Sequence, residues 1–256
     1  MNLIFDSHAH YDDKQFGEDR DEVLSSLPEK GVGWVVNAAS DLDSAQRCIE
    51  LAEKYDYIYA AVGVHPHAAK SWNEESETRL RRLAENTKVV AIGEAGLDYH
   101  YDFSPRDKQK EVFERQIIIA KELDLPIVIH DREAHGDMYD ILRKYAPLKG
   151  VVHCFSGSVE LAKETERLGL HIGLGGAVTF KNAKTPLEVA ACVSDDRLLI
   201  ETDCPYMAPV PLRGKRCDSS MIAITAEKIA QIRGTTVDEL LCLTANNASA
   251  LFKIKL

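Results

Sequence analysis

The chain has 256 residues, of which 45% are hydrophobic and 28% charged, and its formal net charge is -10. This composition excludes a fibrous or disordered protein, and the acidic balance disfavours one that grips long duplex DNA through a broad basic surface. No apolar run approaches the roughly 20 residues that cross a bilayer, so we expect no contact with a membrane.

Eight short apolar runs, bounded by Gly, Pro and polar residues, predict buried β-strands. Their continuous hydrophobicity is typical of parallel strands that are covered on both faces. In chain order they are Leu3–Phe5, Val32–Val36, Tyr57–Val64, Val89–Ile92, Pro126–Ile129, Gly150–Val152, Leu170–Leu174 and Leu198–Thr202.

Segments with helical periodicity, such as the one around Ile117, lie between these strands. Strand and helix alternate eight times without a Gly/Ser linker, which predicts an α/β fold and a single (β/α)8 TIM barrel that forms one domain over residues 1–256. Extra C-terminal helices are expected at Ser219–Arg233 and Val237–Phe252, with a break at Gly234.

Residues of the types that bind metals follow the predicted strands. They are His8 and His10 after the first strand, His65 and His67 after the third, Glu94 after the fourth, His130 at the end of the fifth, His153 at the end of the sixth and Asp203 at the end of the eighth. In a parallel barrel the carboxyl ends of the strands meet at one face. The pattern therefore predicts one shared cleft.

Six of these residues are predicted metal ligands: His8, His10, Glu94, His130, His153 and Asp203. Four imidazoles and two carboxylates exceed what one ion needs once water is included, which favours two divalent metal ions. Glu94 lies centrally enough in strand order to bridge them. A lone histidine pair is more often a packing or surface pair, but six such residues at strand ends favour the metal interpretation.

The remaining histidines have no partners at matching spacing. His100, His135 and His171 are expected to be structural. In the pair His65 and His67, only His65 directly follows the strand, and we assign only His65 to the site.

Three residues are predicted to be catalytic: Asp203, His65 and Glu201. Asp203 combines the roles of ligand and general base, because a carboxylate beside a metal-activated water can take its proton. Glu201 either holds a neighbouring residue in place, assists the proton transfer or is purely structural.

Cationic side chains near the same face suggest a phosphate-bearing substrate. They are Arg132 after the fifth strand, Lys181 after the seventh, and Arg213, Lys215 and Arg216 after the eighth. Arginine forks fit phosphate oxygens, and we predict that His65, Arg132 and Arg213 bind substrate phosphate. The alternative is a solvated charged loop at residues 213–216.

The ordered motifs of the chain resemble the TatD-type metal-dependent deoxyribonucleases, a family of amidohydrolase-like barrels. The resemblance spans nearly the whole chain. It rests on DSHAH at 6–10, GVHPH at 63–67, GEAGLDY at 93–99, PIVIH at 126–130, HCFSG at 153–157 and ETDCP at 201–205, with weaker matches at TFKN 179–182, RGKR 213–216 and NASALF 247–252.

The resemblance implies a (β/α)8 fold, two divalent ions and exonuclease-like cleavage of DNA, and it places the family's ligands on the same six residues. It implies magnesium, whereas four imidazoles suit manganese or zinc as well. One departure follows Arg216, where the family usually continues with Asn, an acidic residue and Pro, but this chain has Cys217, Asp218 and Ser219. That departure bears on substrate preference rather than on the metals.

The expected partner is nucleic acid as substrate, as DNA ends or single strands, and no obligate protein partner is indicated. The expected location is the cytoplasm, because the residues after Met1 lack a signal-peptide pattern and the six cysteines include no CxxC pair. One alternative keeps the site but changes the bond, as in an aminoacyl-tRNA deacylase. Another is a non-catalytic binding module with a structural metal.

Overall fold

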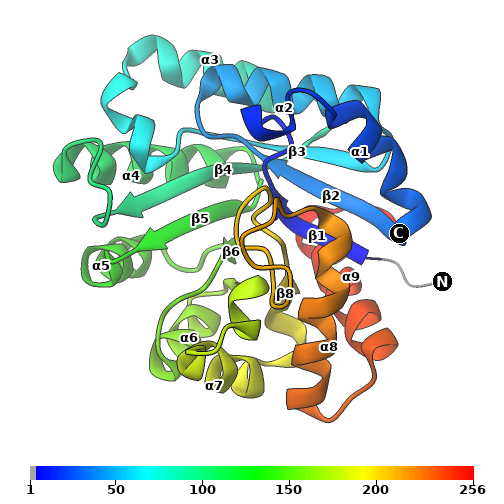
Figure 1. The fold of residues 1–256 in the computed structure, drawn as a ribbon. Helices are drawn as coiled ribbons and strands as arrows, with labels where there is room; N and C mark the ends of the chain where they lie inside the picture. The colour runs from blue at the N-terminus through cyan, green and yellow to red at the C-terminus, as the bar shows by residue number, and fades with distance from the viewer. Residues whose placement is uncertain (1–3) are drawn as a thin grey trace.

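The fold is an eight-stranded parallel sheet that curls into a barrel, with helices around its outside (Figure 1). The computed structural model describes residues 4–256, so Leu3, the first residue of a predicted strand, lies outside them. The strands pair in chain order and are β1 (Ile4–Ala9), β2 (Val32–Ala38), β3 (Ile58–Val62), β4 (Val89–Asp98), β5 (Ile127–Arg132), β6 (Gly150–Val152), β7 (His171–Leu174) and β8 (Leu198–Ile200). The predicted (β/α)8 TIM barrel is confirmed.

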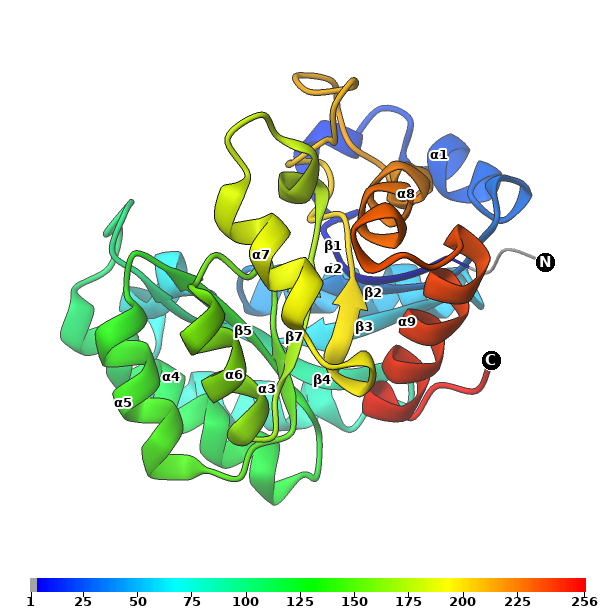
Figure 2. The ribbon, with the colours of Figure 1, turned by 90° about the horizontal axis from the view of Figure 1, so that it is seen from below.

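Helices follow the strands on the outside of the barrel (Figure 1). They are α1 (Arg20–Ser26), α2 (Leu42–Lys54), α3 (Glu74–Ala84), α4 (Arg106–Glu122), α5 (His135–Tyr145), α6 (Val159–Arg167), α7 (Lys184–Cys192), α8 (Ile222–Arg233) and α9 (Val237–Phe252). The two extra C-terminal helices lie side by side (Figure 2), and the chain turns between them at Gly234, whose φ of 67° is left-handed. These helices are confirmed, except that the first three residues of the predicted 219–233 helix form a short 3-10 turn.

The barrel closes between β8 and β1 without a regular hydrogen-bonded ladder. The amide of Asp203 donates to the carbonyl of His8 (3.0 Å), and the amide of His10 donates to the carbonyl of Cys204 (2.7 Å). Beneath them, the buried Asp6 carboxylate accepts hydrogen bonds from the hydroxyls of Thr202 (2.6 Å) and Ser219 (2.7 Å). The seam therefore joins the first predicted metal-ligand motif directly to the last.

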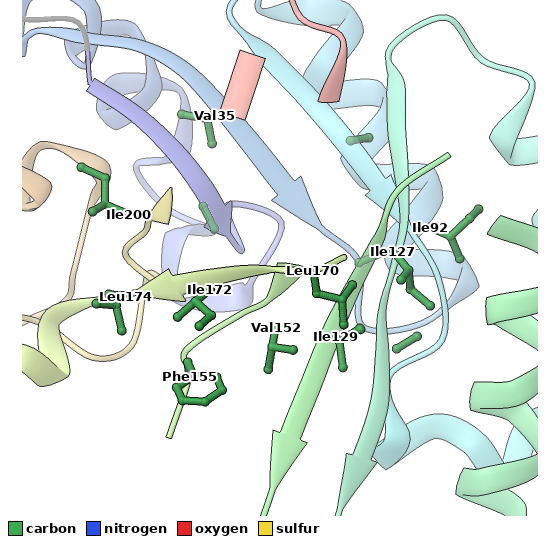
Figure 3. Packing of buried hydrophobic residues seen from close by; sticks show 14 of the residues in the cluster. Val35, Ile92, Ile127, Ile129, Val152, Phe155, Leu170, Ile172, Leu174 and Ile200 are labelled. Carbon is green, nitrogen blue, oxygen red and sulfur yellow. The ribbon is translucent and has the colours of Figure 1, made fainter. Parts of the chain in front are cut away.

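Two apolar layers hold the fold together. The outer layer packs strand side chains against the helices, and Figure 3 shows part of it, including Ile127, Ile129, Ile172 and Leu174. The inner layer fills the barrel with the strand residues that point the other way, as the two-residue side-chain period of a strand requires. Its base is covered by α9, whose Phe252 ring stacks on Phe5 at 6.2 Å.

Among residues 4–256, no helix combines the length and the apolarity that crossing a bilayer requires.

Candidate metal centre

A β-bulge in β4 aims Glu94 into the mouth of the barrel. The register against β5 shifts between Ile92 and Ala95, and Gly93 adopts a φ of 146°. A Cβ at Gly93 would lie 2.8 Å from the carbonyl oxygen of Val128, so only glycine fits this position. The strand was predicted to end at Ile92, but it continues through the bulge to Asp98, and Glu94 lies within it.

The two oxygens of Glu94 face two different sets of histidines. Oε2 lies 3.4 Å from Nε2 of His8 and 3.4 Å from Nε2 of His10. Oε1 lies 2.7 Å from Nδ1 of His130 and 2.7 Å from Nε2 of His153. This is the arrangement that a carboxylate needs to bridge two ions.

Asp203 completes the first of these sets. Its Oδ1 lies 3.3 Å from Nε2 of His10 and 3.7 Å from Nε2 of His8. The residue has a left-handed φ of 60°. The hydrogen bond that its backbone amide donates to the His8 carbonyl holds it in this conformation. Positive φ is uncommon for a non-glycine residue and often marks a functional site.

Hydrogen bonds and close carboxylate contacts on the far side of the rings orient the histidines. Nδ1 of His10 lies 2.8 Å from the carbonyl of Ala38, which places the ring proton on Nδ1 and leaves Nε2 free to bind an ion. Nδ1 of His153 lies 3.5 Å from the buried carboxylate of Glu201, whose Oε1 also accepts the amide of Cys154. Nε2 of His130 lies 3.3 Å from Oδ2 of Asp98.

His65 differs from the other four histidines of the cluster. Its Nδ1 accepts the backbone amide of His67 (3.2 Å), so the neutral ring carries its proton on Nε2. That Nε2 lies 3.4 Å from Oε1 of Glu94. Burial lowers the pKa of His65 to about 4, which keeps the ring neutral at neutral pH. His65 is therefore a hydrogen-bond donor toward the cleft.

The donor set fits divalent cations. Three overlapping groups, His8/Glu94/His153, His8/His10/Asp203 and His65/Glu94/His130, have ligand atoms within 4.8 Å of one another. Among residues 4–256 no Lys or Arg lies within ion-pair distance of Glu94 or Asp203. Burial alone would raise the pKa of Glu94, but the surrounding imidazoles hold it well below its usual range. The cluster thus favours positive charge at its centre.

Comparison with known proteins identifies the family of this chain. A family model described as "TatD related DNase" matches residues 5–253. This chain belongs to the TatD family. It is a metal-dependent hydrolase.

Three TatD relatives illustrate the match. "Uncharacterized metal-dependent hydrolase YabD" of Bacillus subtilis is 45% identical, over 98% of this chain and 100% of the relative. "3'-5' ssDNA/RNA exonuclease TatD" of Erwinia amylovora is 37% identical, over 97% of this chain and 99% of the relative. The crystal structure of YJJV, a TatD homologue from Escherichia coli, superposes with a TM-score of 0.92 at 32% identity, with 98% of each chain covered.

Residues without a role predicted from the sequence also lie against the cluster. His67 was left out, yet its Nε2 lies 2.8 Å from Oδ2 of Asp98, the carboxylate that also faces His130. Asp98 and Asp6 stand in quoted motifs but were given no role. Each is buried and accepts hydrogen bonds from the loops that carry the site.

The predicted cations divide into two kinds. Arg132 lies with its guanidinium 5.0 Å from the Tyr101 ring, and Arg213 lies 4.2 Å from the Phe180 ring. Neither forms an ion pair within residues 4–256, and both are exposed enough to meet a substrate. Arg216 instead forms a two-pronged ion pair with Asp19 (2.8 and 2.5 Å), which removes it as a free cation.

Proposed function

We propose that this TatD-family hydrolase is a deoxyribonuclease that removes nucleotides from DNA ends or single strands with a two-metal centre. The observation that carries the proposal is that the two carboxylate oxygens of Glu94 face separate sets of histidines. When bound, two divalent ions would supply the Lewis acidity that polarises a phosphoryl oxygen and makes water nucleophilic at neutral pH. The relative named as a single-strand exonuclease supports the choice of bond.

The exposure of three carboxylates separates their roles. The side chain of Asp203 is 19% exposed, that of Glu94 3% and that of Glu201 0%. Of these three carboxylates, Asp203 alone both contacts the histidines and is open enough to meet a water, so it would take the proton from the attacking water. Glu94 would help to hold both ions, and Glu201 orients His153 rather than taking part in proton transfer.

His65 supplies a neutral donor for the substrate. Its Nε2–H points into the cleft beside Glu94, where it can bind a phosphoryl oxygen as charge develops on it. Arg132 and Arg213 can hold the neighbouring phosphates, because neither has a carboxylate partner within the part of the chain that the structure describes. Local cations and metals thus offset the acidic net charge at this one place.

The test is hydrolysis of end-labelled single-stranded and duplex DNA by chelator-treated protein, before and after addition of magnesium, manganese or zinc. We expect stepwise shortening of single strands that returns with metal and is absent in Asp203→Asn. Metal analysis of the loaded protein should give two ions per chain.

A parallel assay with aminoacyl-tRNA covers the alternative substrate, because deacylation leaves the nucleic acid chain intact whereas phosphodiester cleavage shortens it. Deacylation together with intact DNA under every metal would overturn the nuclease proposal. Binding of one ion per chain with full nuclease activity would overturn the two-metal part of it.

A further inference from the structure

Exposed aromatic side chains in this protein gather at the mouth of the barrel. Of its seven Phe, nine Tyr and two Trp residues, those exposed among residues 4–256 are Tyr101, Phe103 and Tyr206. Tyr101 and Phe103 follow β4, and Tyr206 follows β8, so all three stand in loops at the carboxyl ends of the strands. Aromatic rings elsewhere are buried or half-buried, which makes this placement unlike the rest of the surface.

Tyr101 and Phe103 form a stacked pair of rings that we call the aromatic platform. Their ring centroids are 5.4 Å apart with an interplanar angle of 28°, and 48% of Tyr101 and 56% of Phe103 is exposed. Leaving two large rings in water gives up the stabilisation that burial would provide, about 1.5–3 kcal/mol for a fully buried large side chain. A stacked pair of rings that stays half exposed can extend its stack with another flat apolar group.

The platform lies one ring away from the metal-binding cluster. The His67 ring contacts both platform rings edge-on, with centroids 5.3 Å from Tyr101 and 4.8 Å from Phe103. On its other side His67 lies 4.3 Å from the His65 ring. A group on the platform would therefore sit within about one nucleotide of the cleft.

The loop that carries the platform is held rigidly to the site. Oδ1 of Asp98 accepts the amide of Tyr101 (2.8 Å), while Oδ2 of the same carboxylate faces His67. The hydroxyl of Ser104 donates to the carbonyl of His67 (2.9 Å). The Gln109 side chain donates to the carbonyl of Ser104 (2.8 Å). A loop fixed in this way loses little entropy when a ligand binds.

Charge beside the platform matches a nucleic acid strand. The exposed Arg132 guanidinium lies 5.0 Å from the Tyr101 ring and has no ion-pair partner within residues 4–256. A base stacked on the rings would bring its own phosphate close to this cation. Aromatic rings next to a free arginine are the usual way in which proteins hold unpaired bases.

We infer that the aromatic platform of Tyr101 and Phe103, with Arg132 over the Tyr101 ring, stacks one unpaired nucleobase of the substrate strand next to the reacting phosphodiester. This inference rests on the proposed nuclease function and names the substrate feature that the site selects. A paired base has its faces covered by neighbours in the duplex, so the platform favours single strands over blunt duplex ends.

The test compares oligonucleotides of one sequence that carry a single abasic residue at each of the last three positions. With metal-loaded wild type, an abasic residue at one position should raise KM by about 5- to 150-fold, the range expected for the loss of one stacked base. The double variant Tyr101→Ala/Phe103→Ala should show a similarly raised KM on the intact oligonucleotide and no further rise at that abasic position.

Two matched variants separate stacking from other causes. Tyr101→Phe/Phe103→Tyr keeps both rings and should retain the discrimination between intact and abasic strands. Tyr101→Leu/Phe103→Leu keeps apolar bulk without rings and should lose it. Equal metal content and unfolding midpoints in all variants show that the fold and the cluster are intact.

Direct binding distinguishes failure of this inference from failure of the proposed function. An oligonucleotide with 2-aminopurine at the sensitive position should show quenched fluorescence on wild type and not on the double alanine variant, whether or not the strand is cut. Cleavage with equal KM values for intact and abasic strands, and equal quenching in both proteins, would overturn the platform. Absence of any cleavage alongside ring-dependent quenching would overturn only the nuclease proposal.

Discussion

At the carboxyl ends of the strands the barrel gathers five imidazoles and two carboxylates, whereas at the amino ends α9 packs Phe252 and Leu251 onto the strand interior. The first arrangement is costly, because ionisable groups leave water and face one another. The second is favourable in proportion to the apolar area it buries. The comparison teaches that stability and chemistry are assigned to opposite ends of one barrel.

The largest effect should be on activity and should come from a substitution at the mouth of the barrel, where the carboxyl ends of the strands lie. Asp203→Asn removes the carboxylate charge that takes a proton from water, and we expect nuclease turnover to fall by about 10²- to 10⁴-fold. The free energy of unfolding should fall only slightly. Burial alone would raise the pKa of Asp203, but His10 outweighs it and lowers the pKa, so the charged carboxylate contributes modestly to the folded state at neutral pH. Steady-state kinetics and denaturant unfolding of the same preparation check both parts. A large loss of stability together with retained turnover would show that this end of the barrel serves stability rather than chemistry.

The next largest effect should be on stability and should come from a substitution at the base of the barrel, where α9 covers the amino ends of the strands. Phe252→Ala removes a side chain that is 2% exposed and stacks on Phe5, and it should lower the free energy of unfolding by about 3–5 kcal/mol. Activity per folded molecule should be unchanged. Leu256→Ala, at a residue 45% exposed, is the matched control and should have little effect. A large loss of activity in folded Phe252→Ala protein would show that packing at the base also controls the chemistry at the mouth.

Glu201, which contacts His153 but not the substrate, tests whether a residue can affect metal binding without taking part in the chemistry. Glu201→Gln keeps the shape that fits against Gly173, where even a Cβ would lie 2.3 Å from Oε2, but it removes the charge that faces His153. We expect metal affinity to fall by about 10- to 100-fold, with activity recovered at high metal concentration. Calorimetric metal titration measures this. Reduced activity that excess metal does not restore would assign Glu201 to the proton transfer instead.

The smallest effect should come from the outer surface, far from both ends. Glu77 accepts hydrogen bonds from Arg81 (2.9 Å) and Arg115 (2.6 Å). Burial alone would raise the pKa of Glu77, but the two guanidinium groups outweigh it and lower it below 4.5. Glu77→Ala should cost about 1 kcal/mol or less at neutral pH.

The pH dependence of the Glu77 effect follows from the direction of that shift. A lowered carboxyl pKa stabilises the folded state above the ordinary value of 4.5, and this contribution is lost as the pH falls through the lowered pKa. The difference between wild type and Glu77→Ala should therefore narrow in acid. A difference that grows as the pH falls would contradict the ion-pair explanation.

The same contrast explains what the sequence could predict. Strand positions and the six proposed metal ligands were accessible, because short apolar runs end where the ligands stand and a parallel barrel brings those ends together. The bulge that places Glu94 inside β4 was not accessible, since it depends on how closely Gly93 approaches Val128. A close contact between the backbones of two neighbouring strands produces no periodic pattern of residues that the sequence could reveal.

Pairings between distant residues were equally hidden. An aspartate after a strand is a common turn residue, so nothing marked Asp98 as the group that holds both His67 and the Tyr101 loop. The ion pair between Arg216 and Asp19 joins residues 197 positions apart, and no local pattern foretells which arginine of the 213–216 loop stays free. The exposed aromatic platform was missed for a similar reason, because Tyr101 and Phe103 could equally have been buried.

The seam between β1 and β8 also constrains when the protein can become active as it is made. Asp203 is held by the carbonyl of His8, and Asp6 is tied to Thr202 and Ser219, so the cluster needs both the first and the last strand in place. A growing chain emerges with His8 first, and Asp203 follows only after the rest of the barrel has been synthesised. If Asp203 acts as proposed, the nascent polypeptide is expected to stay inert until its final strand has docked.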